Sequence, residues 1–429
     1  MFKLTRVIAA LAALVAMSVF AASCGEDDDG GGTAEITFWH GQTDVWANCL
    51  KKQIEEFNAT HPDVQVSTDA GGVVADRMLQ KVTAGLQAGN YPDVAYIFGS
   101  DLANLAKGDE LLDLTEATED GRIDFDAFVP AGQEAVTVDD RVRAVPALID
   151  NLAVVYNKKI FDEAGVAYPT DDWTWDEFRA TAAKLTDEGA GIVGTGWPGT
   201  GDEDTTWRIW PLVWQLGGDV VSEDGESVGF DNEAGERSLA YVNDLAADGS
   251  VYVDTTAGAE RMNQLFQSDK MAMIVTGPWN LPDFVLAKMD YGVAHLPAFE
   301  GEHTTIAGPD VWAIFDNGEQ RSEGAIEFVA WLTSAEQNLR CAKQSGSLPT
   351  RQDLSELEGY DEYVKSLPGL EKFVDNIDNS QVRPTVPEYP QISQALGKAI
   401  GLMLFEEAEP AEALSEAVDR ANAELGVPG

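Results

Sequence analysis

From Ile36 onward, short runs of β-forming residues alternate with amphipathic helical patterns, and this alternation most restricts the folds open to the chain. Strand patterns occupy 36–39, 64–66 and 93–98, and helical patterns lie between them. In the first helical pattern the apolar side chains, spaced four, four and three positions apart, are Trp46, Leu50, Ile54 and Phe57. The order strand, helix, strand, helix, strand predicts an α/β fold with largely parallel sheets.

The length and the charge of the chain limit both its organisation and its partners. At 429 residues the chain exceeds one ordinary domain, so two lobes are expected. Its 74 acidic and 28 basic residues give a net charge of −46, which repels nucleic-acid phosphates and anionic lipid headgroups. We therefore expect no nucleic-acid partner and a solvated acidic surface; a cation-binding role for that surface is the alternative.

The N-terminal residues predict export from the cytoplasm. Lys3 and Arg6 precede a 16-residue apolar run, 7–22, that is too short to span a membrane comfortably. This run ends in 21–24 (AASC), which resembles the lipobox of bacterial lipoproteins. The resemblance implies that 1–23 is a signal peptide and that Cys24 carries a diacylglycerol; the alternative is an ordinary signal peptide that leaves a free thiol.

The segment 24–33 is expected to tether a folded domain to that anchor. Residues 25–32 (GEDDDGGG) include no apolar side chain and cannot pack. No other hydrophobic run approaches membrane-spanning length. We expect a monomer on the extracytoplasmic face, extracellular or periplasmic, attached to the membrane through its lipid only.

Two further cysteines, Cys49 and Cys341, remain in the mature chain. An exported protein resides where disulfides persist, so a Cys49–Cys341 bridge is one hypothesis. Two buried free thiols are the alternative, because free cysteine is commonly buried.

Capping patterns place two later helices. Thr174–Glu177 forms a capping box, Trp173 and Phe178 a hydrophobic staple, and a helix is predicted over 175–187. Ser334–Gln337 predicts a second capping box after a helix that ends near residue 333.

Motifs for cofactors, metals or catalysis are weak. Residues 189–194 (GAGIVG) have dinucleotide-loop spacing, but a helix precedes them and an aromatic loop follows, so we interpret them as a helix stop and turn. None of the four histidines has metal-ligand spacing, and no nucleophile elbow is found. With 74 acidic residues, no glycosidase pair can be singled out. We expect no cofactor, no metal and no enzyme activity.

Tryptophan is abundant, with eleven residues, several of them at the ends of predicted elements. The apolar face of a sugar can lie on an indole ring while its hydroxyls bind carboxylates, amides and guanidinium groups. Each tryptophan taken alone is more typical of a hydrophobic core.

A series of segments resembles the family 1 extracellular solute-binding proteins of ABC importers, and the second half resembles their maltose-binding members most. The resemblance covers nearly the whole mature chain. Its segments are 36–40 (ITFWH), 57–64 (FNATHPDV), 91–94 (YPDV), 143–146 (RAVP), 156–165 (YNKKIFDEAG), 174–178 (TWDEF), 271–279 (MAMIVTGPW), 291–297 (YGVAHLP) and 346–351 (GSLPTR).

The resemblance implies a two-lobed periplasmic-binding-protein fold with a cleft that closes on a ligand. The permease would recognise this closed form. Lobe one would comprise 34–148 plus 312–345, and lobe two 153–306 plus 350–429. Hinges would lie near Asp150, Gly308 and Ser347.

Matching positions carry the family's ligand-binding residues onto this chain. The resemblance implies ligand contacts at His40, Gln42, Asp44, Ser100, Asp101, Asp150, Asn151, Trp207 and Trp279. Where the maltose-binding members place a tryptophan and an arginine on their sugar, this chain has Leu396 and Ile400, so maltose is not inferred. Other members suggest Asp310, Arg351, Glu388 and Tyr389 as substitutes.

The function implied is capture of a mono- or oligosaccharide for an ABC permease. The alternatives are another small polar solute, such as glycerol phosphate, a polyamine or an amino-acid derivative, and a surface glycoside hydrolase.

Overall fold

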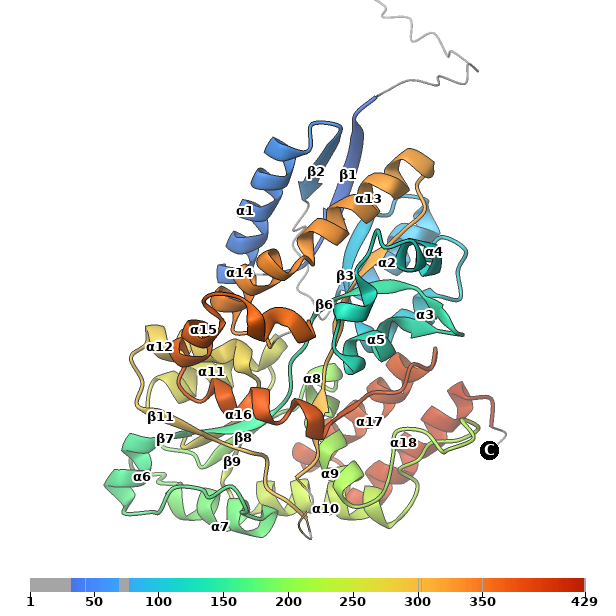
Figure 1. Ribbon diagram of the computed structural model, residues 1–429. Helices are drawn as coiled ribbons and strands as arrows, with labels where there is room; N and C mark the ends of the chain where they lie inside the picture. The colour runs from blue at the N-terminus through green and yellow to red at the C-terminus, as the bar shows by residue number, and fades with distance from the viewer. Residues whose placement is uncertain are drawn as a thin grey trace, which may run out of the picture. The chain divides into compact units, whose positions relative to one another are not determined.

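The computed structural model describes residues 32–42, 44–68, 77–299, 301, 303–348 and 350–427 (Figure 1). The predicted signal peptide, Cys24 and most of the tether lie outside the described residues, as does the side chain of Asp44. Across the described ranges, every helix is too short or too polar to cross a membrane.

A five-stranded sheet has the strand order β2-β1-β3-β13-β6. Its strands are β1 (Ala34–Trp39), β2 (Val64–Thr68), β3 (Val94–Phe98), β6 (Ala144–Leu148) and β13 (Asp310–Ile314). The helices α1 (Asp44–Thr60) and α2 (Met78–Ala88) connect the first three strands, which confirms the predicted strand–helix order.

The prediction of largely parallel sheets is wrong. Strand β1 pairs in parallel with β2 and β3, but β13 pairs antiparallel with β3 and β6. The reason is that β13 comes from a late part of the chain, which enters the sheet in the opposite direction. A long connection leaves strand direction free, and short amphipathic patterns do not reveal it.

The remaining sheets are small. They have the orders β10-β7-β11, β12-β14, β4-β5 and β8-β9. Their strands are β4 (Thr137–Val138), β5 (Arg141–Val142), β7 (Ala153–Asn157), β8 (Thr195–Pro198), β9 (Val251–Asp254), β10 (Met273–Thr276), β11 (Tyr291–Ala294), β12 (Thr305–Ala307) and β14 (Ser380–Val382). The pairs β12-β14 and β8-β9 are parallel, whereas β7 is antiparallel to both of its neighbours.

Helices cover these sheets (Figure 1). The other α-helices are α3 (Leu102–Leu105), α4 (Thr115–Glu119), α5 (Pro130–Val136), α6 (Lys158–Ala164), α7 (Trp175–Leu185), α8 (Glu203–Trp207), α9 (Trp210–Gln215), α10 (Glu233–Ala247), α11 (Glu260–Gln267), α12 (Leu281–Leu286), α13 (Glu319–Leu332), α14 (Ala335–Ser345), α15 (Tyr360–Ser366), α16 (Leu370–Asp375), α17 (Tyr389–Leu404) and α18 (Pro410–Glu424).

Buried apolar side chains form three clusters. One gathers around the five-stranded sheet, from residues 34–148 and 311–332. A second draws on residues 152–306 and 389–421, and a third on residues 149–307 and 339–373. Leu339 and Ala342, in α14, pack with the third cluster and not with the first.

Three chain segments cross between these clusters and are hydrogen-bonded to one another. The Gly308 N–H donates to the Asp150 carbonyl at 2.7 Å, and the Asp150 N–H donates back at 3.4 Å. The Leu348 N–H donates to the Ile149 carbonyl at 3.1 Å. The three segments expected to act as hinges therefore lie side by side.

The capping predictions have different outcomes. In α7 both hydrogen bonds of the Thr174–Glu177 box are present, and the rings of Trp173 and Phe178 lie 5.6 Å apart. The second box is wrong, because Ser334 makes no side-chain cap bond among the described residues. Buried Gln337 instead accepts hydrogen bonds from Gln53 and Arg340.

Residues 188–191 form the predicted turn after α7, with Gly191 at a φ of 64°. A disulfide joins Cys49 in α1 to Cys341 in α14, with the two Cα atoms 5.9 Å apart. These two helices pack side by side (Figure 1).

Candidate functional site

A cleft with a cavity volume of about 380 Å³ lies beside the crossing segments. Such a volume is within the range of small-molecule sites in proteins. Its lining draws on both predicted lobes: Gln42, Val45, Trp46, Tyr96, Phe98, Leu148, Asp150, Glu203, Asp204, Trp207, Gly258, Trp279, Asn280, Asp283, Gly308, Asp310, Ser345, Ser347 and Arg383.

Two tryptophans of the lining owe their positions to glycines. A Cβ atom on Gly277 would lie 1.7 Å from the Trp279 ring, and a Cβ atom on Gly308 would lie 2.3 Å from the Trp207 ring. Since no side chain fits at either glycine, each indole packs directly over main chain.

Two carboxyl groups from crossing segments face the cleft. Asp150 precedes β7 and Asp310 begins β13, and both are over nine-tenths buried. The hydroxyl of Tyr96 donates a hydrogen bond to Asp310. Burial, and then the nearby Asp310, raise the pKa of Asp150 well above its usual range.

A buried polar network forms another wall of the cleft. The Arg383 guanidinium lies 2.6 Å from the Glu203 carboxylate, to which the Tyr389 hydroxyl donates at 2.7 Å. Arg383 also lies over the Trp207 ring, 4.5 Å from its centroid. The guanidinium thus fixes both a carboxylate and an aromatic face.

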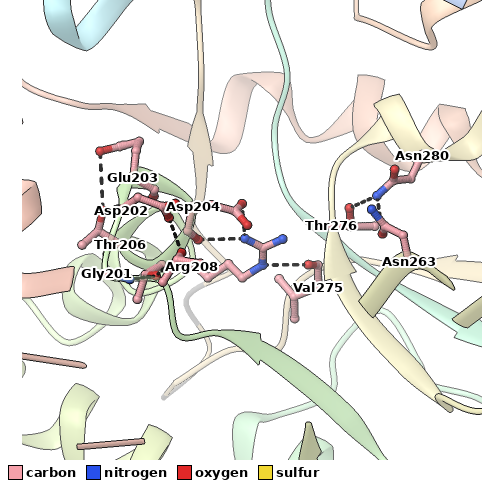
Figure 2. Close-up of polar contacts among 12 residues, drawn as sticks. Gly201, Asp202, Glu203, Asp204, Thr206, Arg208, Asn263, Val275, Thr276 and Asn280 are labelled. Atoms are coloured by element: carbon pink, nitrogen blue, oxygen red, sulfur yellow. Dashed lines mark hydrogen bonds and ion pairs between the residues drawn. The ribbon is translucent and has the colours of Figure 1, made fainter. Parts of the chain in front are cut away.

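A second ion pair lies next to it. Figure 2 shows Arg208 between Asp204 and the carbonyl of Val275, with distances of 2.5 Å to the carboxylate and 3.1 Å to the carbonyl. On the other side, the amide of Asn280 donates to Thr276 at 2.7 Å and to Asn263 at 2.8 Å (Figure 2). These contacts hold α8 and the start of α12 at the cleft.

Several buried polar atoms in the lining have no hydrogen-bond partner among the described residues. They comprise donors and acceptors: Gln42 Nε2, Trp207 Nε1, Arg383 Nε, Asp150 Oδ1 and Asp204 Oδ2. Buried polar groups are ordinarily paired, and an orphaned group costs about 1–3 kcal/mol. The cleft is therefore suited to a solute that both donates and accepts hydrogen bonds.

Five of the predicted ligand-binding residues line this cleft, namely Gln42, Asp150, Trp207, Trp279 and Asp310. Four lie near it but outside the lining. His40 is buried, and its Nδ1 accepts a hydrogen bond from the Gln42 N–H at 3.0 Å. Burial, and to a lesser extent the positive charge of Lys81, lower the pKa of His40 to about 4.

The other three near residues are Ser100, Asp101 and Asn151. The Ser100 hydroxyl is buried without a partner in the described part of the chain. Burial, and then Glu203, raise the pKa of Asp101 to about 8. The Asn151 amide donates to the Phe373 carbonyl at 2.8 Å, a structural contact.

Three predicted contacts are engaged elsewhere. Arg351 forms ion pairs with Asp124 and Asp353, at 2.7 and 2.8 Å. Glu388 pairs with Lys107 at 2.8 Å. Tyr389 is fully buried behind Glu203 and supports the wall without lining it.

Sequence reasoning missed several lining residues, among them Trp46, Tyr96, Glu203, Asp204, Asn280 and Arg383. Trp46 and Tyr96 lie at positions that the apolar periodicity assigns to the hydrophobic core. Glu203 and Asp204 cannot be singled out, because the chain has many other acidic residues. Only Arg383 carries a usable signal, a scarce basic residue directly before a proline. Within the described ranges, no group of three or more His, Cys, Asp or Glu side chains is placed to hold a metal ion.

Known proteins resemble this chain along most of its length. The sn-glycerol-3-phosphate-binding periplasmic protein UgpB of Brucella melitensis is 24% identical over 417 residues, covering 91% of this chain and 93% of that protein. The cyclic alpha-maltosyl-1,6-maltose binding protein of Arthrobacter globiformis is 27% identical, with a TM-score of 0.75 and coverage of 92% and 99%. The GacH receptor of Streptomyces glaucescens, 24% identical, gives a TM-score of 0.81 with the same coverage.

These likenesses confirm the predicted two-lobed periplasmic-binding-protein fold. A family model described as bacterial extracellular solute-binding protein matches residues 47–339, well over half of the chain. The protein belongs to the bacterial extracellular solute-binding protein family.

Proposed function

We propose that the protein captures a mono- or oligosaccharide in the cleft and delivers it to the permease of an ABC importer. The observation that carries this proposal is the pairing of tryptophan rings with orphaned donors and acceptors in one lining. Each sugar hydroxyl both donates and accepts, and the C–H face of the ring packs on indole. The names of the Arthrobacter protein and of the Streptomyces complex with acarbose agree with such a ligand.

Glycerol phosphate is the second candidate, because several relatives are named for binding it. The lining, however, has five carboxyl groups and one guanidinium, which is already paired with Glu203. The ionised carboxylates among these groups would repel a phosphate. The charge of the cleft therefore favours a saccharide over glycerol phosphate.

In this proposal, lobe one is 34–148 plus 312–345 and lobe two is 153–306 plus 350–429, with hinges at the three crossings. We propose that the permease accepts the form in which the two lobes are closed on the ligand. Contacts between the lobes outside the cleft support this, because they hold the lobes together. The Asn104 amide donates to the Pro387 carbonyl at 3.0 Å, and Lys107 pairs with Glu388. A ligand that touches both lobes stabilises the closed form by its additional contacts.

The proposal places the protein outside the cytoplasm, attached to the membrane through a lipid on Cys24 and acting as a monomer. The basic, apolar and small-residue order of 1–24 supports this placement. Binding without chemical change is proposed, in keeping with the family.

A thermal-shift screen of the purified protein against sugars, glycerol phosphate and polyamines tests the function. A ligand at 100 times its Kd stabilises by about 2.7 kcal/mol, a clear rise in melting temperature. We expect saccharide hits that calorimetry confirms and that are recovered intact. Hits confined to glycerol phosphate or polyamines would overturn the sugar assignment, and a cleaved sugar would reveal an enzyme.

A further inference from the structure

One carboxyl group that lines the cleft, Asp150, has no balancing cation among the described residues. Of the five carboxyl groups in the lining, Glu203 is paired with Arg383 and Asp204 with Arg208. In the described part of the chain, no ion pair includes Asp150. A carboxylate held away from water without a cation is costly, since isolated buried charges are stabilised poorly.

Asp150 is the lining carboxyl with the clearest need of an external partner. Its side chain is 8% exposed, and its Oδ1 finds no hydrogen-bond partner among the described residues. Its charged neighbour, Asp310, has the same sign and also raises its pKa. Two carboxylates that share a cleft repel each other unless a proton or a cation lies between them.

An ammonium group satisfies this arrangement better than a hydroxyl does. It brings three N–H donors and the missing positive charge, whereas a hydroxyl brings one donor and no charge. Charge-assisted hydrogen bonds are also about twice as strong as neutral ones. The aromatic lining and the orphaned donors Gln42 Nε2 and Trp207 Nε1 still require a hydroxyl-rich body.

We propose that Asp150 and Asp310 together bind a protonated amino group, and that the solute is therefore an amine-bearing saccharide. The proposal rests on the carbohydrate function above and names its substrate class. Arg383 and Trp207 lie on another wall and bind the neutral part of the sugar.

Matched sugar pairs test this inference by calorimetry on the purified protein. Each pair sets an amino sugar beside the neutral sugar with a hydroxyl at the same carbon: glucosamine and glucose, galactosamine and galactose, and the β-1,4 dimers of glucosamine and of glucose. We expect at least one amino sugar to bind about tenfold or more tightly than its neutral partner.

Variants then assign the selectivity to its residues. Asp150→Asn keeps the side-chain shape and removes the charge, so the preference for the amino sugar should fall to about twofold or less; Asp310→Asn should act in the same direction. Asp361→Asn, an exposed carboxylate on α15, serves as the matched control and should keep the full preference.

The outcomes separate this inference from the proposed function. Neutral sugars that bind as tightly as their amino partners would overturn the amine assignment and leave the carbohydrate function intact. Failure of every saccharide, with or without a polyamine hit, would overturn the carbohydrate function and this inference with it. A preference that Asp150→Asn and Asp310→Asn both retain would also overturn the inference, because the amine would then bind elsewhere.

Discussion

The indole of Trp279 lies directly over the main chain at Gly277, and it lines the cleft beside Asn280 and Asp283. Residues that combine such an aromatic face with fixed polar neighbours decide what a cleft of this kind can bind. Because Gly277 has no side chain, the ring packs closely on the main chain there, and such packing preorganises Trp279 for stacking, so that it loses little freedom when a ligand binds.

We expect Trp279→Ala to weaken saccharide binding by at least about tenfold, or about 1.4 kcal/mol, because a stacking face is lost. Calorimetry with the saccharide identified in the screen measures the change. Trp279→Phe keeps an aromatic face and should retain most of the affinity. Equal affinity of the alanine variant and the unmodified protein would remove Trp279 from the site.

The partly buried carboxyl of Asp101 predicts a pH effect. Burial and Glu203 raise its pKa to about 8 in the folded protein, whereas an unfolded chain gives about 4. Between these values the folded state binds the extra proton, so this carboxyl makes stability fall as pH rises from about 4 to about 8. Asp101→Asn should therefore gain stability relative to the unmodified protein across that window.

Urea midpoints of both proteins at several pH values measure this difference. Groups distant from Asp101 titrate alike in the two proteins, so the difference reports on Asp101 together with the neighbours coupled to it, such as Glu203. A constant difference from pH 4 to pH 8 would contradict the raised pKa.

At the scale of elements, α7 and α14 offer a matched comparison of helix starts. Both begin after a residue typical of an N-cap, but only Thr174 accepts the bond from the N–H three residues on. The side-chain oxygen of Gln337 accepts hydrogen bonds from Gln53 and Arg340. Tertiary contacts therefore replace the capping box that the local sequence pattern predicts for α14.

Thr174→Ala should lower the free energy of unfolding by about 1 kcal/mol, the usual value of an N-cap bond. Ser334→Ala is the control and should change it by a few tenths of a kcal/mol at most, because it removes no cap bond. Chemical denaturation of the two variants measures both values. Equal losses would show that the two caps do not differ as described.

At the scale of the whole molecule, one disulfide closes a very long loop, since Cys49 and Cys341 are 292 positions apart in the chain. It fastens α14, which follows β13 and α13, to α1 near the chain's first strand. Cross-links of distant residues stabilise mainly by restricting the unfolded chain.

Replacing both cysteines by serine should cost roughly 2–5 kcal/mol of folding free energy, measured by urea unfolding. The unmodified protein treated with a reductant should approach the stability of the double variant. In the denatured, unreduced mature protein, thiol titration should find neither cysteine free; two free thiols would contradict the bridge.

The sequence determined those features that depend on neighbouring residues. Apolar spacing and capping pairs placed α1, α2 and α7 and the first three strands, because helix and strand periods are local properties. Matching segments also identified the family and five lining residues, including Asp150 and Trp279, since short motifs persist where the backbone must take one conformation.

Only the tertiary structure decided which distant residues meet. The antiparallel pairing of β13, the ion pair of Glu203 with Arg383 and the ion pair of Arg351 with Asp124 join positions up to 227 apart in the chain. Such contacts depend on how the chain crosses between its clusters, which no local pattern contains. Among 74 acidic residues, the matching segments pointed to Asp150, but only the folded structure shows that its carboxyl is buried at the cleft and does not face water.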